Sequence, residues 1–576
     1  MRKQHKTHRK TKQASEQAGP TLIARSVALF DQYGFLLLLG TAPFVFTNNV
    51  GHFENIPKIM YLVWGAVLLA LLRLMRYPQP REPSLQFVPL DYAVVLFYGC
   101  CWLSLLQAVN PYQAAVPVIH WGAAVGLYFL LRSMPKSTKV VSYFFFVSGL
   151  SCGLVSILGI CQYAFNVDWV PQVVPPASTF TNRNMASQFV ALCFPLTMGA
   201  VLAAKKLWQK LLFVGVLLAE TVYLLCTQTR SAWLAVVTVI FLGVVFLPFF
   251  VVQIRAAFTL KKMLVGAVFM ITICAAALWL TTRESLGLDV DALRYRLFSI
   301  VNISDNQTAS QTAQLRLIWW KNSLHMVKDN LWLGVGPGNF KVHYPRYANA
   351  SAQDWSFSEE FQAQQVHNDH LQMLVELGVT GGVAYAGMFV FFLYAFICLW
   401  RRSEPAVRMQ AVVLLLGVVS LSICALFSFS LQRAMTPLYL VALFALLLSL
   451  YQHPQEAAGK RVALRRSGGA RLLSGVVIVL FLMISTYFLR CVIFADRAYC
   501  ASLSLYERGR YAEAIVRLPR ERIYMCLEPN IYASRIRASL NLGRYDDALS
   551  QYFVAKKVLP YNVNLIRFAG LCYFNQ

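Results

Sequence analysis

Charged residues are scarce in this sequence. Asp, Glu, Lys and Arg make up only 14% of the 576 residues, whereas 57% are hydrophobic and the mean hydropathy is +0.52. Soluble globular proteins average about 25% charged and about 45–50% apolar residues. The composition therefore excludes a soluble enzyme with a small anchor and a disordered basic protein. It indicates an integral membrane protein.

Acidic residues are the scarcer of the two signs. The chain has 26 Asp and Glu against 52 Lys and Arg, which gives a formal net charge of +26. Such an excess is typical of nucleic-acid-binding proteins, and also of membrane proteins whose cytoplasmic loops are basic. The positions of the cations along the chain distinguish these two classes.

Several catalytic and metal-binding motifs are absent. The sequence contains no GxxxxGK[ST] and no HExxH, and it has neither a CxxC pair nor a Cys/His cluster with zinc spacing. Its apolar runs lack the chains of ionisable residues that proton-driven transporters use. These absences disfavour an ATPase, a protease and a pump.

The cysteines do not suggest a disulfide framework. Ten of the 13 lie inside apolar runs, where a thiol packs as a small hydrophobic group. The other three are Cys500, Cys526 and Cys572. The sequence leaves open a disulfide among them.

Long apolar runs fill most of the chain. A bilayer core about 30 Å thick needs roughly 20 apolar residues per helix. We therefore predict an all-α, polytopic membrane protein with about 12–13 transmembrane helices. The thirteen expected spans are 27–47, 57–76, 90–109, 113–132, 139–165, 184–204, 207–227, 231–252, 262–282, 371–400, 407–429, 434–451 and 471–494.

The distribution of Lys and Arg predicts the orientation. With the N-terminus inside, 27 of the 52 cations fall in the N-terminal tail and six cytoplasmic loops, as the positive-inside rule requires. The opposite short loops hold one cation each at Lys58, Arg183, Arg230 and Arg433. The excess charge is therefore mostly a topology signal, and no nucleic-acid partner is expected.

These spans divide the chain into three parts. We expect a basic cytoplasmic tail at 1–26, a transmembrane domain at 27–494 and a periplasmic C-terminal domain at 495–576. A large periplasmic loop at 283–370 interrupts the transmembrane domain. It contains an amphipathic pattern over 314–330, with Leu317, Trp320, Leu324 and Val327 at helical spacing. This helix would either lie on the membrane interface or cap the bundle.

The C-terminal part contains an internal repeat. "ERGRYAEAI" (507–515) and "NLGRYDDAL" (541–549) align with Gly509 and Gly543 at a spacing of 34 residues. This period resembles tetratricopeptide repeats, helical pairs that bind partners. Because two units are marginal alone, we expect the repeats to dock on the bundle or on a partner protein, without catalysis.

Two arginines lie where outer loops meet spans. Arg183 and Arg230 stand among Asn182, Asn184 and Thr229 at expected helix starts. A helix N-terminus offers free N–H groups, and a guanidinium grips phosphate with two hydrogen bonds. The pattern favours an anion site, although each arginine alone could instead reach a lipid phosphate.

A second polar cluster opens the tenth span. In "HNDH" (367–370), a histidine near the membrane surface could take a proton from a hydroxyl, or the cluster could simply cap a helix. Adjacent residues cannot all face one ion, so His367 and His370 are not expected to bind a metal. The sequence predicts no metal site.

These motifs, in this order, resemble the bacterial O-antigen ligase superfamily, which includes O-antigen polymerases and protein O-oligosaccharyltransferases. The resemblance covers roughly 175–450 and the layout of many spans with one large periplasmic loop. The segments that carry it are "TNRN" (181–184), "TQTRSAWLA" (227–235), "LRLIWWKNSL" (315–324), "GVGPGNF" (334–340) and "HNDHLQMLVELGVTGG" (367–382).

The resemblance implies a function. It implies a metal- and cofactor-independent, inverting glycosyltransferase of the bacterial inner membrane that works on the periplasmic face. The donor would be a glycan on undecaprenyl diphosphate and the acceptor a hydroxyl of lipid A–core. The implied site residues are the base His367, the diphosphate-binding Arg230, Arg316 and Arg183, and the supporting Asn184, Asn368 and Glu376.

The chain departs from the family in its last part. Ligases of this superfamily usually stop near twelve spans, whereas this chain adds a thirteenth span and the repeats. The acceptor is therefore open between lipid A–core, a growing glycan and a protein. Two other classes remain: a glycan or lipid transporter, which should show repeated halves that the sequence lacks, and a non-catalytic assembly protein acting through its repeats.

Overall fold

The computed structural model describes residues 22–48, 51, 54–76, 87–134, 137–250, 307–348, 362–451 and 468–576. These residues form α-helices joined by short 3-10 helices and loops. The described residues contain one isolated β-bridge and no β-strand. The expected ninth span, 262–282, and most of the expected N-terminal tail lie outside the described residues.

The long apolar runs form helices that span the membrane. Eleven described helices are long and apolar enough to cross a bilayer, and they match eleven of the thirteen expected spans. This confirms an all-α, multi-pass membrane protein. The helices are α2 (Leu22–Thr41), α3 (Asn55–Arg76), α4 (Pro89–Ser104), α5 (Pro111–Arg132), α6 (Thr138–Phe165), α7 (Arg183–Ala203), α8 (Leu207–Thr227), α9 (Arg230–Phe246), α15 (Asp369–Arg402), α16 (Pro405–Leu426) and α18 (Gly468–Glu507).

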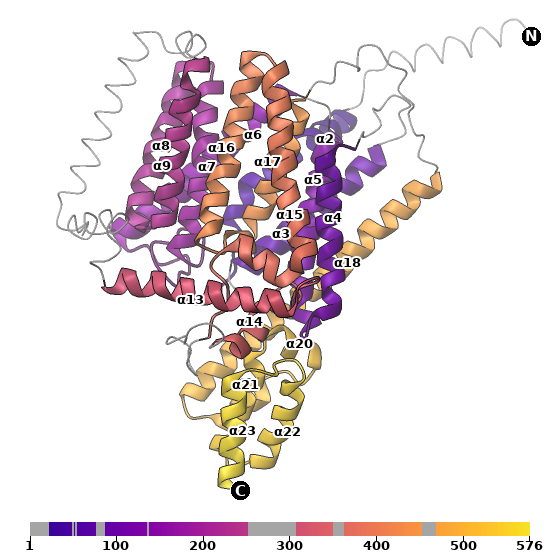
Figure 1. Cartoon of the computed structure of the whole chain (residues 1–576), viewed down its shortest axis with the longest axis vertical. Helices are drawn as coiled ribbons and strands as arrows, with labels where there is room; N and C mark the ends of the chain where they lie inside the picture. The colour runs from indigo at the N-terminus through magenta and orange to yellow at the C-terminus, as the bar shows by residue number, and fades with distance from the viewer. Residues whose placement is uncertain are drawn as a thin grey trace, which may run out of the picture.

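The expected twelfth span is shorter than predicted. It forms α17 (Met435–Ser449), whose 15 residues cover only about 22 Å. Almost all of its side chains are buried, and it packs against α5 and α16 in the middle of the bundle (Figure 1). Because other helices surround α17, its length does not have to match the lipid.

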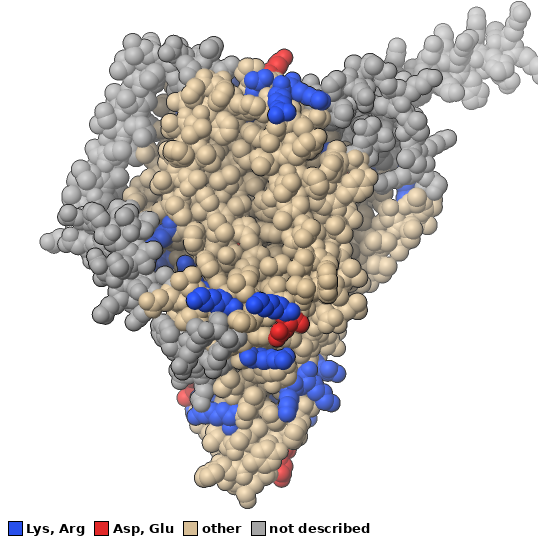
Figure 2. Space-filling model, in the orientation of Figure 1, with Lys and Arg blue, Asp and Glu red and all other residues tan. Residues whose placement is uncertain are grey.

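Charged side chains gather at the two ends of the bundle. Figure 2 shows Lys and Arg at both ends and almost none across the broad middle. Asp31, inside the first span, is buried and lies 3.3 Å from Arg73 of α3. This pairing compensates an acidic group that would be costly to bury alone.

One amphipathic helix lies across the bundle end. Helix α13 (Gln307–Asp329) runs below the long helices in Figure 1 and packs against α15. Its buried apolar side chains are Trp319, Met326 and Val327, whereas Leu317 and Leu324 are about half exposed. The helix therefore packs on the end of the bundle. Of the predicted apolar stripe, Val327 is buried and Trp320 is half-buried, because apolar residues occur on more than one side of this helix.

Helix α15 is broken near its start. At Gly378 the backbone leaves the helical region, with φ +66° and ψ −171°. The break frees backbone groups, and the loop after α13 pairs with them. The Val335 N–H donates to the Val375 carbonyl (3.1 Å), and the Gly336 N–H donates to the Glu376 carbonyl (3.0 Å).

Glycine allows the two backbones to approach this closely. A Cβ on Gly334 would lie 2.4 Å from the Glu376 carbonyl group, and one on Gly378 would lie 2.4 Å from the carbonyl group of Trp332. Both glycines have positive φ. The "GVGPGNF" and "ELGVTGG" motifs thus meet as a backbone crossing that fixes α13 against α15.

The C-terminal part is helical and contacts the bundle. Beyond α18 it comprises α19 (Tyr511–Arg517), α20 (Arg522–Leu527), α21 (Asn530–Asn541), α22 (Tyr545–Lys556) and α23 (Val563–Asn575), at the lower end in Figure 1. Gly509 and Gly543, the equivalent positions of the repeat, share a positive φ of +74° and +69°.

Buried polar groups hold this part to the bundle. The Asn110 side chain, before α5, donates to the Cys526 carbonyl (2.8 Å), and its backbone N–H donates to Asn339 Oδ1 (2.8 Å). Cys500, Cys526 and Cys572 are free thiols. No disulfide joins these three cysteines, and the C-terminal domain is held to the bundle by non-covalent contacts.

We predict that Gly378→Ala destabilises the protein by at least about 2 kcal/mol, because this φ/ψ region is essentially restricted to glycine. The new Cβ would also overlap the Trp332 carbonyl group. Thermal unfolding of the purified protein in detergent measures the loss. Gly387→Ala in the same helix, where the nearest heavy atom would be 3.8 Å away, is the matched control and should leave the melting temperature unchanged. Equal melting temperatures for both variants would contradict the crossing.

Candidate active site

Three spanning helices, α7, α9 and α15, begin at the same end of the bundle. Helices α7 and α9 are joined where they start, because Thr229 Oγ1 donates to Asn184 Oδ1 (3.0 Å). The Asn182 side chain caps α7, and the Asn368 side chain caps α15 by accepting the Leu371 N–H (3.1 Å). Helix N-termini carry partial positive charge, so this arrangement favours an anion.

The loop between α16 and α17 completes the site. Gln188 of α7 donates to Ser428 Oγ (2.7 Å) and accepts from Ser430 Oγ (2.9 Å). The Leu431 N–H donates to Asp369 Oδ2 at the start of α15 (2.7 Å). These buried bonds fix the loop relative to both helices.

His367 lies between aromatic rings. Its imidazole stacks on Trp319 of α13, with centroids 5.2 Å apart and an interplanar angle of 28°, and it meets Phe429 at 86° and 5.1 Å. The residue has a φ of +57°, and the neighbouring Asn368, not His367, caps the helix. These two contacts orient the imidazole ring. The ring nitrogens are the atoms of this side chain that can accept a proton.

Arg230 acts electrostatically on Arg316, and Arg316 acts on His367. Burial lowers the pKa of Arg316, and the positive charge of Arg230 lowers it further. Burial also lowers the pKa of His367 to about 4, with a smaller contribution from the charge of Arg316. The structure therefore brings together three predicted site residues that are separated by up to 137 positions in the sequence.

The remaining predicted residues have different positions. Arg183 is the first residue of α7, beside Asn184, and its backbone N–H donates to the Val174 carbonyl (2.9 Å). Glu376 is buried two residues before the break in α15, where it accepts the Gly338 N–H (2.9 Å) and a hydrogen bond from Gln372 (2.9 Å). Glu376 thus holds the glycine-rich turn in place.

The described residues offer no metal site. No group of three or more His, Cys, Asp and Glu residues in this part of the chain could hold an ion. His370 faces the bundle, where Nε2 is 3.2 Å from the Ser422 carbonyl oxygen and Nδ1 is 3.0 Å from the Tyr385 hydroxyl. His367 and His370 therefore have separate surroundings.

Sequence reasoning missed a second charged cluster beside the site. Lys58 donates to Glu54 (2.9 Å) and to the Thr179 carbonyl (2.6 Å), and both charged side chains are buried. The Arg433 guanidinium is 3.7 Å from Glu54 and lies over the Phe429 ring, 5.0 Å from its centroid. Lys58 and Arg433 could have been noticed in the sequence because they are single cations in short outer loops. Nothing in the sequence distinguishes Phe429 from other apolar residues.

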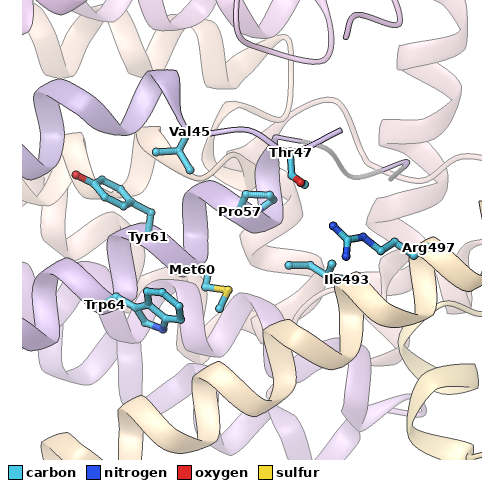
Figure 3. A pocket seen from close by; sticks show the side chains of 8 residues that line it. All are labelled: Val45, Thr47, Pro57, Met60, Tyr61, Trp64, Ile493 and Arg497. Carbon is cyan, nitrogen blue, oxygen red and sulfur yellow. The ribbon is translucent and has the colours of Figure 1, made fainter. Parts of the chain in front are cut away.

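A separate groove runs between α3 and α18 (Figure 3). Its volume is about 240 Å³, and its walls are mainly apolar, with Arg497 at one end. None of the predicted site residues lines this groove. The lining residues are Val45, Thr47, Pro57, Met60, Tyr61, Trp64, Ile493 and Arg497.

Comparison with known proteins identifies one family. A protein-family model described as O-antigen ligase matches residues 212–386. No curated protein matches the chain. The matched segment contains Arg230, Arg316 and His367 together with the crossing of Gly334 and Gly378. Arg183, Asn184 and the C-terminal repeats lie outside it.

We predict that Arg316→Gln raises the pKa of His367. In the wild type the ring should stay neutral from pH 7 down to about pH 5, because its pKa is about 4. Removing the neighbouring positive charge moves the pKa upward, toward the ordinary value of about 6.5. Histidine NMR of the labelled full-length protein, with His367→Gln to assign the signal, measures this shift.

Lys321→Gln is the matched control. Lys321 is an exposed cation on the same helix. The variant should leave the titration of His367 unchanged. An unaltered pKa in Arg316→Gln would show that its charge does not act on the imidazole.

Proposed function

Because residues 212–386 belong to the O-antigen ligase superfamily, we propose that this membrane glycosyltransferase transfers a glycan from undecaprenyl diphosphate to a hydroxyl of lipid A–core. The observation that carries the proposal is the neutral, positioned His367 beside the Arg230–Arg316 pair. The two functions needed, a base and a diphosphate-binding site, come from one group of residues.

His367 is the proposed base. An imidazole with a lowered pKa is unprotonated at neutral pH and can accept the proton of an attacking hydroxyl. Contacts with Trp319 and Phe429 restrict the rotation of the ring. The imidazole is therefore already oriented when the acceptor binds.

Arg230 and Arg316 are the proposed diphosphate ligands. Their mutual repulsion is an energetic cost that a bound dianion would relieve. Two guanidinium groups can form several charge-assisted hydrogen bonds to phosphate oxygens, and the starts of α7 and α9 add backbone dipoles. These groups stabilise the negative charge that develops on the leaving group, in a role that metal ions fill elsewhere.

The proposed reaction is one displacement. The acceptor oxygen forms a bond to the anomeric carbon while the bond from that carbon to the diphosphate oxygen breaks. The hydroxyl proton passes to His367, and undecaprenyl diphosphate leaves with the electron pair. Attack from the side opposite the leaving group inverts the anomeric centre. Arg183, Asn184 and Asn368 would shape the donor side of the site.

The proposed location is the periplasmic face of a bacterial inner membrane, with the N-terminus in the cytoplasm. The bias of Lys and Arg toward one set of loops supports this orientation. His367, α13 and the C-terminal helices share one end of the bundle, which would then face the periplasm (Figure 1). The donor glycan is presented there.

The main alternatives are an O-antigen or exopolysaccharide polymerase and a protein O-oligosaccharyltransferase. Both would use the same base and diphosphate ligands. The repeats favour them because helical repeats bind polypeptides, and a protein partner or acceptor could be held near the site. Deleting the gene and analysing the surface lipopolysaccharide and glycoproteins on gels separates these functions. Loss of the long-chain lipopolysaccharide ladder with an intact core indicates a ligase, and a single repeat unit on the core indicates a polymerase. Loss of protein glycans alone indicates an oligosaccharyltransferase.

We predict that His367→Gln lowers glycan transfer by about 100- to 10,000-fold, the usual contribution of a general base. Arg230→Gln should lower transfer by a similar factor, because it removes charge stabilisation of the leaving group. Transfer is measured with purified protein in liposomes that contain a lipid-linked donor, and by the surface glycan ladder of cells that express each variant.

His325→Gln is the control on α13. His325 is half-buried at a position away from the aromatic contacts of His367. This variant should transfer glycan at the wild-type rate. Wild-type transfer by His367→Gln, at equal protein levels in the membrane, would remove the base assignment.

A further inference from the structure

Arg433 lies one aromatic ring away from His367. It belongs to the loop between α16 and α17, and its guanidinium packs over the face of Phe429, whose ring meets the imidazole of His367. Arg316 instead lies on α13, one turn before Trp319, the other ring that contacts His367. Cations thus approach the base from two different elements.

The surroundings of Arg433 orient it without using its hydrogen-bond donors. Its nearest carboxylate oxygen, in Glu54, is 3.7 Å away, beyond hydrogen-bond distance, and Glu54 already accepts bonds from Lys58 (2.9 Å) and Thr181 (3.2 Å). The negative charge of Asp369 also attracts Arg433. These carboxylates hold the guanidinium electrostatically and leave its N–H groups available.

The donors of Arg433 are unsatisfied within the described part of the chain. Its Nε is buried and has no hydrogen-bond partner there, while 22% of the side chain is exposed. A buried donor without an acceptor is costly, and a guanidinium that is mostly enclosed but still partly exposed is suited to an incoming anion. The flat group can stack on Phe429 and still donate two parallel hydrogen bonds, which lysine cannot do.

We propose that Arg433 forms a second anion subsite beside His367, which binds a phosphate or carboxylate group of the acceptor. This inference rests on the proposed function, in which Arg230 and Arg316 hold the donor diphosphate. Since the base must contact the acceptor hydroxyl, an acidic group next to that hydroxyl would lie within reach of a cation that adjoins the base. Arg433 thereby selects acidic acceptors.

Binding of inorganic phosphate tests the subsite without any transfer reaction. In full-length Arg230→Gln/Arg316→Gln protein, which lacks the proposed donor cations, phosphate should raise the melting temperature above that in chloride of equal ionic strength. Adding Arg433→Gln should abolish this rise. A rise that persists in the triple variant overturns the subsite.

Two further variants guard against misfolding and general charge effects. Arg433→Lys keeps the charge and should retain part of the rise. Arg408→Gln, added to the same double variant, is the matched control: Arg408 packs on Trp400 (5.7 Å) at the other end of α16 and donates to the Ser403 carbonyl (2.7 Å). It should retain the full rise, and loss of the rise there would overturn the assignment to Arg433.

Kinetics test the role in acceptor binding. With an intact lipid A–core acceptor, Arg433→Gln should raise the acceptor KM by about 10- to 100-fold, the usual effect of losing a charged hydrogen bond, while the donor KM and kcat stay within about twofold. With a dephosphorylated, carboxyl-reduced acceptor, wild type and variant should have the same high KM.

The outcomes separate this inference from the proposed function. A raised donor KM in Arg433→Gln would assign Arg433 to the diphosphate and overturn acceptor selection. If wild-type protein transfers no glycan, the proposed function fails and acceptor selection fails with it. The phosphate measurement still decides whether the anion subsite exists.

Discussion

The site depends on the contact between the backbones of α15 and the loop after α13. Helix α15 breaks at Gly378, and its released carbonyl groups accept hydrogen bonds from Val335 and Gly336. Because this contact fixes α13 across the end of the bundle, Trp319 is held under the imidazole of His367 and Arg316 is held one turn away. A site made of residues far apart in the sequence thus relies on two glycines that contribute no side chain.

The cost of the site is electrostatic. Arg230 and Arg316 repel each other, and Arg316 also disfavours the protonated form of His367. Arg433 adds a third cation, which the ring of Phe429 separates from the imidazole, with buried Glu54 and Asp369 as partial compensation. Such stored repulsion is relieved by substrate, and the charge of Arg316 adds to the larger effect of burial in keeping the base neutral.

The sequence predicted the spans well because runs of about 20 consecutive apolar residues are long enough to cross a bilayer and rarely form anything else. It also predicted His367, Arg230 and Arg316, but Arg316 came only from the family pattern, since a cation on an amphipathic helix is usually solvated. The apolar stripe predicted for α13 matches the buried face only in part, because periodicity does not identify the side that meets a partner. Phe429 and the pairing of Lys58 with Glu54 depend on contacts between distant segments, which no local pattern encodes.

The C-terminal helices are part of the same scaffold. Asn110 bonds to the Cys526 carbonyl on one side and to Asn339 on the other, and Asn339 lies next to Gly338, whose N–H binds Glu376 of α15. Burial lowers the pKa of Lys341, but the carboxylates of Glu528 and Glu376, on the C-terminal part and on α15, oppose this shift. A domain joined only by a flexible linker would not share the electrostatic surroundings of a half-buried cation with the bundle. The C-terminal helices and the start of α15 are therefore connected through Asn110 and the glycine-rich turn.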